Sequence, residues 1–414
     1  MNLQSLLAAR VEAGKPVRVG LIGAGKFGSM FLAQVPSIAG LEAALICDRD
    51  VDRAKAACRT VGWDAGRMAG TQFSACGRDA CIDERVEVVV EATGDPGAGI
   101  AHARAAGVIY SLAYGDQPAL IAEMVDWARA AGFIVAAAGK GTKYLPAYHA
   151  VTPDGVWEHY GLTAAEARQA GMNSQMFNSF LDGRLGAIEM AAVANACDLD
   201  VPQDGLLFPP CGADALATVL RPKAIGGVLE RDGMVEVVSS LARDGSPVPR
   251  DLRWGVYVVL KAANDYAAAC FKQYGLPTDA SGRYAPMYKP YHLIGLELSI
   301  SVLNAALRGE PTGSCRAWRG DAVAVAKRTL KAGEMLDGEG GYTVYAKLIP
   351  AAKSLERGAL PIGLAHHVTL TRDVSAGEIL TAADVALDAN QEPVRIRREM
   401  AHDAVSAAKS IAAE

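Results

Sequence analysis

The sequence predicts an α/β fold whose N-terminal part is a parallel sheet covered by helices on both faces. Three observations lead to this expectation. Short apolar runs alternate with stretches of helical periodicity between residues 17 and 150. The apolar runs are continuous, as in strands that are buried on both faces. Several of them end at a turn that contains glycine, which suits a parallel strand that leads into a crossover helix.

Each apolar segment of this region is expected to form either a strand or a helix. We expect strands where apolar residues are continuous and helices where they recur at helical spacing. A short amphipathic helix is expected from Met1 to Lys15. The expected strands are 17–22, 41–47, 86–90, 108–112 and 133–138, and the expected helices are 27–35, 100–106 and 121–131.

The rest of the chain has a different character, which predicts two further domains. Helices are expected at 163–169, 190–196 and 293–307, strands at 235–241 and 252–260, and Pro/Gly-containing loops at 201–212 and 282–290. This mixture is typical of an α+β domain. We therefore expect a dinucleotide-binding domain over residues 1–155, a substrate and oligomerisation domain over 156–315, and a small all-β domain over 316–414.

A short internal echo marks the last of these domains. Lys331–Leu336 reads KAGEML and Ser375–Leu380 reads SAGEIL, and each follows a strand-like stretch and a charged turn. The echo is too short for a solenoid repeat. It predicts two equivalent β turns.

Composition excludes several classes of function. The chain has 414 residues, 51% hydrophobic and 21% charged, with a net charge of -5, which is an ordinary globular balance. It has no long Lys/Arg run, so nucleic acids and membrane surfaces are poor partners. No signal peptide and no apolar run near the ~20 residues of a membrane span is recognised. We expect a cytoplasmic protein, and its eight scattered cysteines have no metal-ligand spacing.

The segment after the first expected strand carries the clearest motif. Gly23, Gly25 and Gly28 form the pattern G-x-G-x-x-G, with Lys26 and Phe27 inside it. The pattern follows a strand and opens a helix, and a carboxylate lies ~20 residues further on, as in Rossmann domains. The first glycine permits the tight turn, the second lets the backbone approach a pyrophosphate, and the third permits close packing of helix on strand. We therefore expect bound NAD or NADP.

The residues that follow the second strand do not decide whether the protein binds NAD or NADP. Asp48 favours NAD because a carboxylate there hydrogen-bonds a ribose 2′-hydroxyl. Arg49 favours NADP because a guanidinium pairs with a 2′-phosphate. Two later turns, at Thr93-Gly94 and from Gly139 to Lys143, are expected to face the nicotinamide half of the cofactor.

Basic residues of the middle domain are the candidates for binding an anionic substrate. Arg221 and Lys223 flank Pro222 in a turn, and Lys289 lies in the expected loop before the long helix. A Lys near a cofactor can polarise a carbonyl or exchange a proton, so Lys289 is the first candidate for catalysis. Lys140 and Lys143 are further candidates. His292 is a candidate substrate ligand or a structural histidine at the helix start.

Two carboxylates, Asp182 and Glu189, share one turn–helix stretch. They either position lysines or ligate Mg²⁺ or Mn²⁺ through oxygen. The pattern does not establish a metal, and salt bridges are the simpler interpretation.

The N-terminal half resembles homoserine dehydrogenases, through the glycine motif, Glu91-Ala92-Thr93-Gly94 and the strand that ends in Gly139-Lys140. Lys140 matches the Lys of an Asn-Lys pair that meets cofactor and substrate in that family, whereas Gly139 replaces the Asn. The stretch from Gly212 to Leu220 lacks the family's catalytic Lys.

Nearly the whole chain is similar to a narrower family, the homoserine-dehydrogenase-like proteins with a C-terminal SAF (β-clip) domain. That family includes the second type of 1-deoxy-D-xylulose 5-phosphate reductoisomerase, called DXR-like. The blocks that carry the similarity are Asn178–Gly183, Ala187–Ala191, Leu220–Lys223, Met287–Glu297 and, for the SAF module, Val368–Val385.

The resemblance implies an NADPH-dependent oxidoreductase acting on a CH–OH group. Its main implication is a reductoisomerase of isoprenoid biosynthesis that converts 1-deoxy-D-xylulose 5-phosphate to 2-C-methyl-D-erythritol 4-phosphate. The alternative is an NAD(P)-dependent dehydrogenase of a sugar acid, hydroxy acid or amino-alcohol, without rearrangement. A nucleotide-sensing protein without catalysis is a third hypothesis. A homodimer or homotetramer is expected, as for most soluble enzymes.

Overall fold

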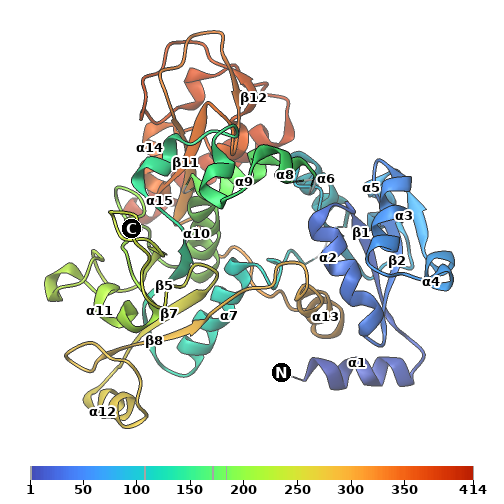
Figure 1. Cartoon of the computed structure of the whole chain (residues 1–414), viewed down its shortest axis with the longest axis horizontal. Helices are drawn as coiled ribbons and strands as arrows, with labels where there is room; N and C mark the ends of the chain where they lie inside the picture. Colours follow the sequence, from blue (N-terminus) through green and yellow to red (C-terminus); the bar gives the residue numbers. More distant parts are fainter. Residues whose placement is uncertain (1, 107–108, 170–171, 183, 414) are drawn as a thin grey trace. The chain divides into compact units, whose positions relative to one another are not determined.

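A computed structural model describes residues 2–106, 109–169, 172–182 and 184–413. The chain divides into two compact units (Figure 1). The first unit contains residues 1–120 and 292–314, and the second contains residues 121–291 and 315–414. The return of residues 292–314 to the first unit was not expected from the order of the elements along the sequence.

The first unit is built on a four-stranded parallel sheet in the order β3-β2-β1-β4. Its elements are α1 (Leu3–Glu12), β1 (Val17–Ile22), α2 (Lys26–Gln34), β2 (Leu41–Cys47), α3 (Val51–Thr60), α4 (Ala65–Gly70), β3 (Gln72–Ser74), α5 (Gly77–Ile82), β4 (Val88–Glu91), α6 (Pro96–Ala106) and α13 (Ser299–Arg308).

Helices cover both faces of this sheet, as the continuous apolar strands predict. One face packs against α1, α2, α3 and α13, through buried side chains such as Phe31, Leu32 and Val302. The other packs against α5, where Ala80 lies over Ile22, Leu45 and Cys47. The Rossmann-like fold is therefore confirmed.

Two of the strands that we expected in this sheet are not part of it. The expected strand 108–112 begins outside the described residues, and its described part, 109–112, is irregular. The expected strand 133–138 forms β5 (Ile134–Thr142), which belongs to the sheet of the second unit. An apolar run alone does not specify which sheet it joins, and this one pairs with strands that lie about a hundred residues further along the chain.

The second unit contains a four-stranded mixed sheet in the order β6-β5-β7-β8. Its elements up to residue 291 are α7 (Gln117–Ala130), which begins in the first unit, β5, α8 (Ala164–Gln169), α9 (Ser174–Leu181), α10 (Arg184–Cys197), α11 (Leu216–Val219), β6 (Met234–Ser239), β7 (Val256–Lys261), α12 (Asp265–Gln273) and β8 (Tyr284–Lys289). β8 occupies the stretch that we expected to be a loop over 282–290. The Gly at its start and Pro286 inside it gave a loop signal, but Pro286 lies on an edge strand, where a missing N–H is tolerated.

The C-terminal part of this unit mixes short strands with helices. It contains β9 (Gly320–Ala326), β10 (Met335–Asp337), β11 (Val344–Pro350), α14 (Ala351–Arg357), β12 (His366–Thr369) and α15 (Glu392–Ala413). The pairs β9/β11 and β10/β12 are antiparallel. Its likeness to an SAF module stays a prediction.

The echoed segments do form equivalent turns. Gly333 and Gly377 both have a positive φ, of 88° and 79°. Arg328 pairs with Glu334 and Arg372 pairs with Glu378 at corresponding positions. The two segments meet through reciprocal backbone hydrogen bonds between Leu330 and Val374, of 2.8 and 3.0 Å. The prediction of two equivalent β turns is confirmed.

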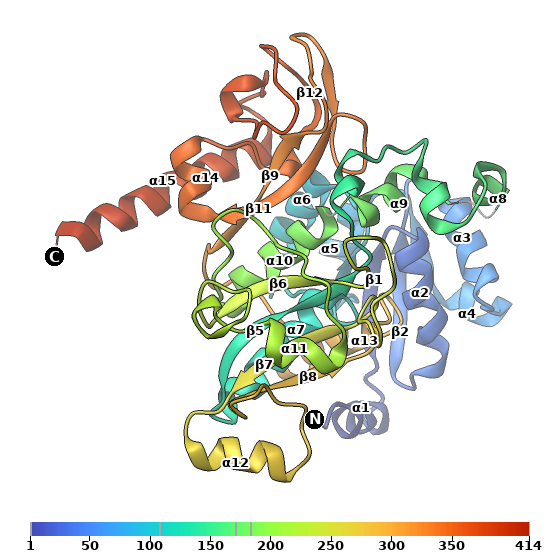
Figure 2. The ribbon, with the colours of Figure 1, turned by 60° about the vertical axis from the view of Figure 1, so that its left-hand side comes forward.

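Helix α10 is the central element of the second unit. It packs against β5 and β6 on one side and against β9 and β11 on the other, as both views show (Figures 1 and 2). Met190, Val193 and Ala194 on this helix are fully buried. The residues after 315 therefore share one core with the mixed sheet.

Candidate functional site

The glycine turn between β1 and α2 has the geometry of a phosphate cradle. Gly23 has a φ of 94°, and a Cβ there would lie 2.7 Å from the carbonyl oxygen of Ala92. A Cβ on Gly28 would collide with the carbonyl oxygen of Gly23, so the helix packs on the turn only without a side chain. Gly25 is the N-cap of α2, and apart from its neighbours along the chain no described atom lies within 4 Å of the position of its missing Cβ. The backbone thus leaves open space at a helix N-terminus, which suits a pyrophosphate.

We expect two glycine variants to separate binding from folding. Gly25→Ala should retain the melting temperature but weaken NAD(P)H binding by about tenfold or more, that is by about 1.4 kcal/mol, because its methyl group occupies the phosphate position. Gly28→Ala should lower the melting temperature because it pushes α2 away from the turn. Fluorescence titration and thermal unfolding measure the two effects. Gly70→Ala, at another open position, is the control; unchanged binding by Gly25→Ala would contradict the cradle.

Asp48, at the end of β2, is engaged within the protein. Its carboxylate accepts hydrogen bonds from the N–H groups of Ala24 and Asp50, both at 3.0 Å, and two from Arg53 at 2.7 and 2.8 Å. Burial raises the pKa of Asp48, but the bonds from Arg53 and the two backbone groups outweigh it and leave the pKa below its ordinary value. Asp48 therefore holds the glycine turn in place.

The neighbouring arginines are placed differently. Arg49 is exposed, and the side chain of Arg53 is 62% exposed although it binds Asp48. Thr93 and Gly94 follow β4 and are exposed as well, and the hydroxyl of Thr93 donates to Glu91. The Thr93 backbone lies beside the glycine turn, since a Cβ on Gly23 would be 3.2 Å from its nitrogen. The predicted cofactor-binding residues are therefore gathered at the carboxyl ends of β1, β2 and β4.

In the second unit, the register of the mixed sheet places two of the predicted lysines in one row. Lys140 in β5 is paired with Val256 in β7, and Val256 is paired with Lys289 in β8. Directly paired residues point to the same face of a sheet. Lys140 and Lys289 therefore share a face, although Lys140 lies inside a strand rather than in the expected turn. We had expected Lys289 to lie in a loop before the long helix. Instead it is the last residue of the edge strand β8, and α13 begins at Ser299.

Lys140 is held by a buried ion pair. Its ammonium contacts the carboxylate of Glu189 on α10, and the two side chains are only 7% and 8% exposed. A buried charge is tolerated only when it is paired, so Glu189 fixes the charge and the direction of Lys140.

Lys143, just beyond the end of β5, is in a different environment. Its ammonium donates to the carbonyl oxygen of His159 at 2.7 Å. Burial lowers the pKa of Lys143, and the nearby charge of Arg253 lowers it further. A Lys in this environment gives up its proton more easily than a surface lysine.

A pair of residues that the sequence analysis did not single out lies after the same strand. The Tyr144 hydroxyl lies 2.9 Å from His149 Nε2, and His149 Nδ1 lies 2.7 Å from the carbonyl oxygen of Asp182. The carbonyl only accepts, so Nδ1 carries the proton and Tyr144 donates to Nε2. Burial lowers the pKa of His149 and raises that of Tyr144, so both are neutral near pH 7. Their position after the carboxyl end of a strand is the signal that could have found them.

The remaining predicted residues have other contacts in the structure. Asp182 pairs with Lys327, at 3.0 Å. Arg221 pairs with Asp279 at 2.7 Å, and Asp279 hydrogen-bonds the backbone of Tyr284, at the opposite end of β8 from Lys289. Lys223 is exposed and lines a small pocket beside β6. His292 belongs to the first unit, where its Nδ1 lies 3.4 Å from the amide nitrogen of Gln117.

Within the part of the chain that the structure describes, no cluster of three or more His, Cys, Asp or Glu side chains is placed to hold a metal ion. Asp182 and Glu189 each pair with a lysine instead. Over the same residues, no helix has the length and apolar character needed to cross a membrane.

Residues 115–298 match the family model described as oxidoreductase DRL, catalytic domain. The matched stretch contains β5 to β8 and with them the lysine row. This match identifies an oxidoreductase catalytic domain in the middle of the chain. No curated protein matches the chain in sequence.

Solved structures with partial likeness are dehydrogenases and reductases. A 3-ketoreductase from Actinomadura kijaniata, in complex with TDP-benzene and NADP, is 15% identical, with a TM-score of 0.23 over 32% of this chain and 50% of that chain. The myo-inositol dehydrogenase of Lactobacillus casei, with NAD(H) and myo-inositol, is 16% identical, with a TM-score of 0.24 over 34% and 50%. A probable dehydrogenase from Thermotoga maritima is 13% identical, with a TM-score of 0.32 over 71% and 90%. The chain thus spans half the length of the first two.

Proposed function

We propose that the chain is an NAD(P)-dependent dehydrogenase that oxidises a hydroxyl group of a small polar substrate, such as a sugar acid, hydroxy acid or amino-alcohol, without rearranging its carbon skeleton. The observation that carries the proposal is the row of Lys140 and Lys289 on one face of a sheet, within the stretch that matches an oxidoreductase catalytic domain. Lysines at a reacting oxygen bind it and exchange its proton.

The glycine turn fits the cofactor that this reaction needs. The Cβ-free space at Gly25 and the N-terminus of α2 accept a pyrophosphate, and the bound nicotinamide would take up the hydride from the substrate carbon. The protein must then remove the hydroxyl proton. Lys289 is the group that we assign to the substrate oxygen, and Lys140, which Glu189 orients, stabilises negative charge that develops there. Lys143, just beyond the end of the strand that carries Lys140, is a further candidate for exchanging this proton, because burial lowers its pKa.

The environment of Asp48 favours NADP over NAD. Its carboxylate already accepts four hydrogen bonds from Ala24, Asp50 and Arg53, so a ribose 2′-hydroxyl would have to compete for it. Arg49 is exposed next to it and can pair with a 2′-phosphate.

Replacing Arg49 by alanine is therefore expected to weaken NADPH binding by about tenfold or more and to leave NADH binding nearly unchanged. A hydrogen bond to a charged group contributes about 1.5–3 kcal/mol, and only NADPH offers the 2′-phosphate. Isothermal titration with both nucleotides measures the effect. Arg59→Ala, a basic residue in the last turn of α3, is the control. An equal loss for both nucleotides would contradict the assignment.

The test of the proposed function is a turnover screen. Purified protein is supplied with NADP⁺ or NAD⁺ and a panel of sugar acids, hydroxy acids, amino-alcohols and polyols, and reduced nicotinamide is followed by absorbance. Oxidation of at least one member that depends on Lys289 is the expected result. Cofactor binding without any turnover across the panel would refute the dehydrogenase.

The reductoisomerase is the second candidate. The resembling blocks Asn178–Gly183, Ala187–Ala191, Leu220–Lys223 and Met287–Glu297 all lie inside the matched residues 115–298. Chelation of a ketone and an adjacent hydroxyl by a divalent cation would assist the rearrangement, but the two carboxylates of this region are paired with lysines. Oxidation of NADPH that depends on 1-deoxy-D-xylulose 5-phosphate would favour this candidate, and its absence with and without Mg²⁺ would remove it.

A further inference from the structure

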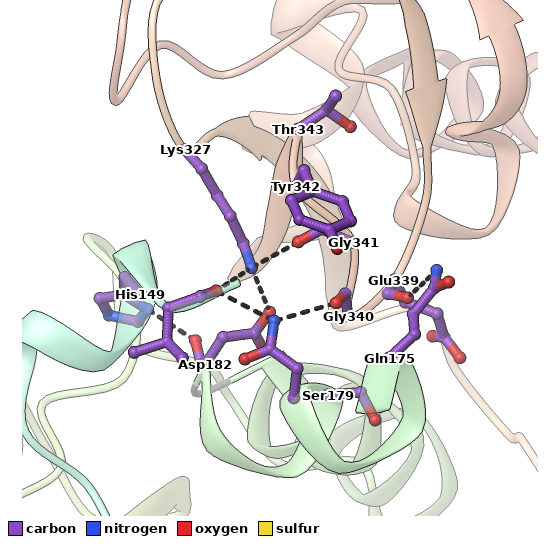
Figure 3. A network of polar contacts seen from close by, with 12 residues as sticks. His149, Gln175, Ser179, Asp182, Lys327, Glu339, Gly340, Gly341, Tyr342 and Thr343 are labelled. Carbon is purple, nitrogen blue, oxygen red and sulfur yellow. Dashed lines mark hydrogen bonds and ion pairs between the residues drawn. The ribbon is translucent and has the colours of Figure 1, made fainter. Parts of the chain in front are cut away.

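The corner between α9 and α10 contains a buried ammonium group among oxygen atoms. Lys327 follows β9, and its side chain is 2% exposed, while that of Asp182 is fully buried. Lys327 Nζ lies 2.8 Å from the carbonyl oxygen of Val151, 2.9 Å from that of Gly341 and 3.0 Å from Asp182 Oδ2. Figure 3 shows the lysine side chain reaching from above to Asp182 below it. These oxygens come from three segments that are far apart in the sequence.

A buried asparagine, Asn178, contacts the same backbone segments as the Lys327 ammonium. Asn178 on α9 is fully buried, and its amide nitrogen donates to Val151 O and Gly340 O, both at 2.9 Å. Its Oδ1 is buried with no hydrogen-bond partner among the described residues. The loop that contains Gly340 and Gly341 packs so closely on α9 that a Cβ on Gly340 would collide with the backbone oxygen of Gln175. The described part of this corner is therefore lined with oxygen atoms, and the Lys327 ammonium balances the buried carboxylate of Asp182 among them.

We infer that Lys327 serves as a built-in monovalent cation, and that without its side chain the corner becomes a binding site for K⁺ or NH₄⁺. Backbone carbonyls and a carboxylate at 2.8–3.0 Å are the ligands by which proteins replace the hydration shell of such ions. An ammonium ion carries the same charge as the lysine head group and donates through N–H groups in the same way, with four of them instead of three. The inference does not depend on the proposed dehydrogenase activity.

The position of this charge makes Lys327 a positioning residue for the candidate site. Asp182 is the C-cap of α9, and Glu189, the partner of Lys140, lies on the following helix α10. The backbone carbonyl of Asp182 also holds His149, which stacks on Tyr345 of β11 at 4.5 Å. Fixing Asp182 therefore fixes the end of α9 and the orientation of His149.

The experiment removes the lysine head group and returns a free cation. Lys327→Ala is expected to lower the melting temperature by roughly 10 °C, because it removes the ammonium that pairs with the buried carboxylate of Asp182. Ammonium or potassium chloride should recover most of that loss, with an effect that grows with the logarithm of concentration, whereas tetramethylammonium chloride at equal ionic strength should not. If the variant does not fold on expression, its refolding yield from denaturant is compared in the same salts, with the same expected selectivity.

Three control variants make the result specific. Lys331→Ala removes a lysine from an exposed pair with Asp373, at 2.7 Å, and should show no ion selectivity. Lys327→Met fills the corner without a charge and should not respond to ammonium. Lys327→Ala combined with Asp182→Asn removes the need for a cation and should also lose the response. Equal effects of ammonium and tetramethylammonium on Lys327→Ala, in both melting and refolding, would overturn the inference.

One activity readout rests on the proposed function. For any substrate found in the turnover screen, ammonium should raise the kcat of Lys327→Ala and leave the KM for the nucleotide unchanged. Failure of this readout alone would count against the positioning role, because the thermal and refolding measurements need no substrate.

Discussion

Replacement of Lys289 by alanine is expected to lower kcat by about 10²–10⁴-fold, the range that a positioned acid or base contributes. Lys289 ends β8 on the same sheet face as Lys140 and is only partly buried, so its removal opens no large cavity, and Lys140 keeps its own partner, Glu189. The melting temperature and the affinity for NADPH should therefore stay close to those of the unmodified protein. Steady-state kinetics and nucleotide titration measure the separation.

A control for this prediction lies in the same sheet. Lys261 ends β7 at the opposite end from the lysine row and pairs with Asp232. Lys261→Ala should keep full turnover. If Lys289→Ala retains more than a tenth of the kcat, the lysine row is not the catalytic centre, and the hypothesis of a nucleotide-sensing protein gains weight.

Replacement of Glu189 by alanine should have the largest effect on stability. It leaves the ammonium of Lys140 buried without its carboxylate, and breaking a buried pair in this way costs about 3–5 kcal/mol. Urea denaturation measures the loss, and kcat should fall with it because Lys140 loses its fixed direction.

The double variant Lys140→Met/Glu189→Leu separates the two consequences. Replacement of both charges by apolar side chains of similar size is often neutral for stability. The double variant should therefore unfold near the urea concentration of the unmodified protein and still lack activity. A double variant with full activity would show that the pair has only a structural role.

Local patterns predicted the nucleotide-binding turn in detail. The tight turn at Gly23, the open backbone at Gly25 and the packing limit at Gly28 all follow from a spacing of a few residues. The prediction for Asp48 and Arg49 was less complete. The sequence placed Asp48 correctly at the end of β2, but its bonds to Ala24 and Arg53 decide what it can bind, and these bonds depend on three-dimensional placement.

Long-range pairing explains what the sequence could not predict. The sheet that β5 joins is set by its pairing with β6 and β7, and the apolar run carries no information on that choice. The sequence does not indicate a role for Lys327, because its partner Asp182 lies far from it in the chain. Lysines usually lie at the surface, so a buried lysine in an exposed-looking charged turn has no local signature.

The central position of α10 has a practical consequence for anyone who works with pieces of this chain. The matched family stretch ends at residue 298, but a recombinant fragment cut there would lose β9 and β11 and uncover the flank of α10 on which they pack. Exposed apolar surface of this kind promotes aggregation. Crystallisation or display of the catalytic region alone therefore requires that the tail stay attached or be supplied as a separate polypeptide.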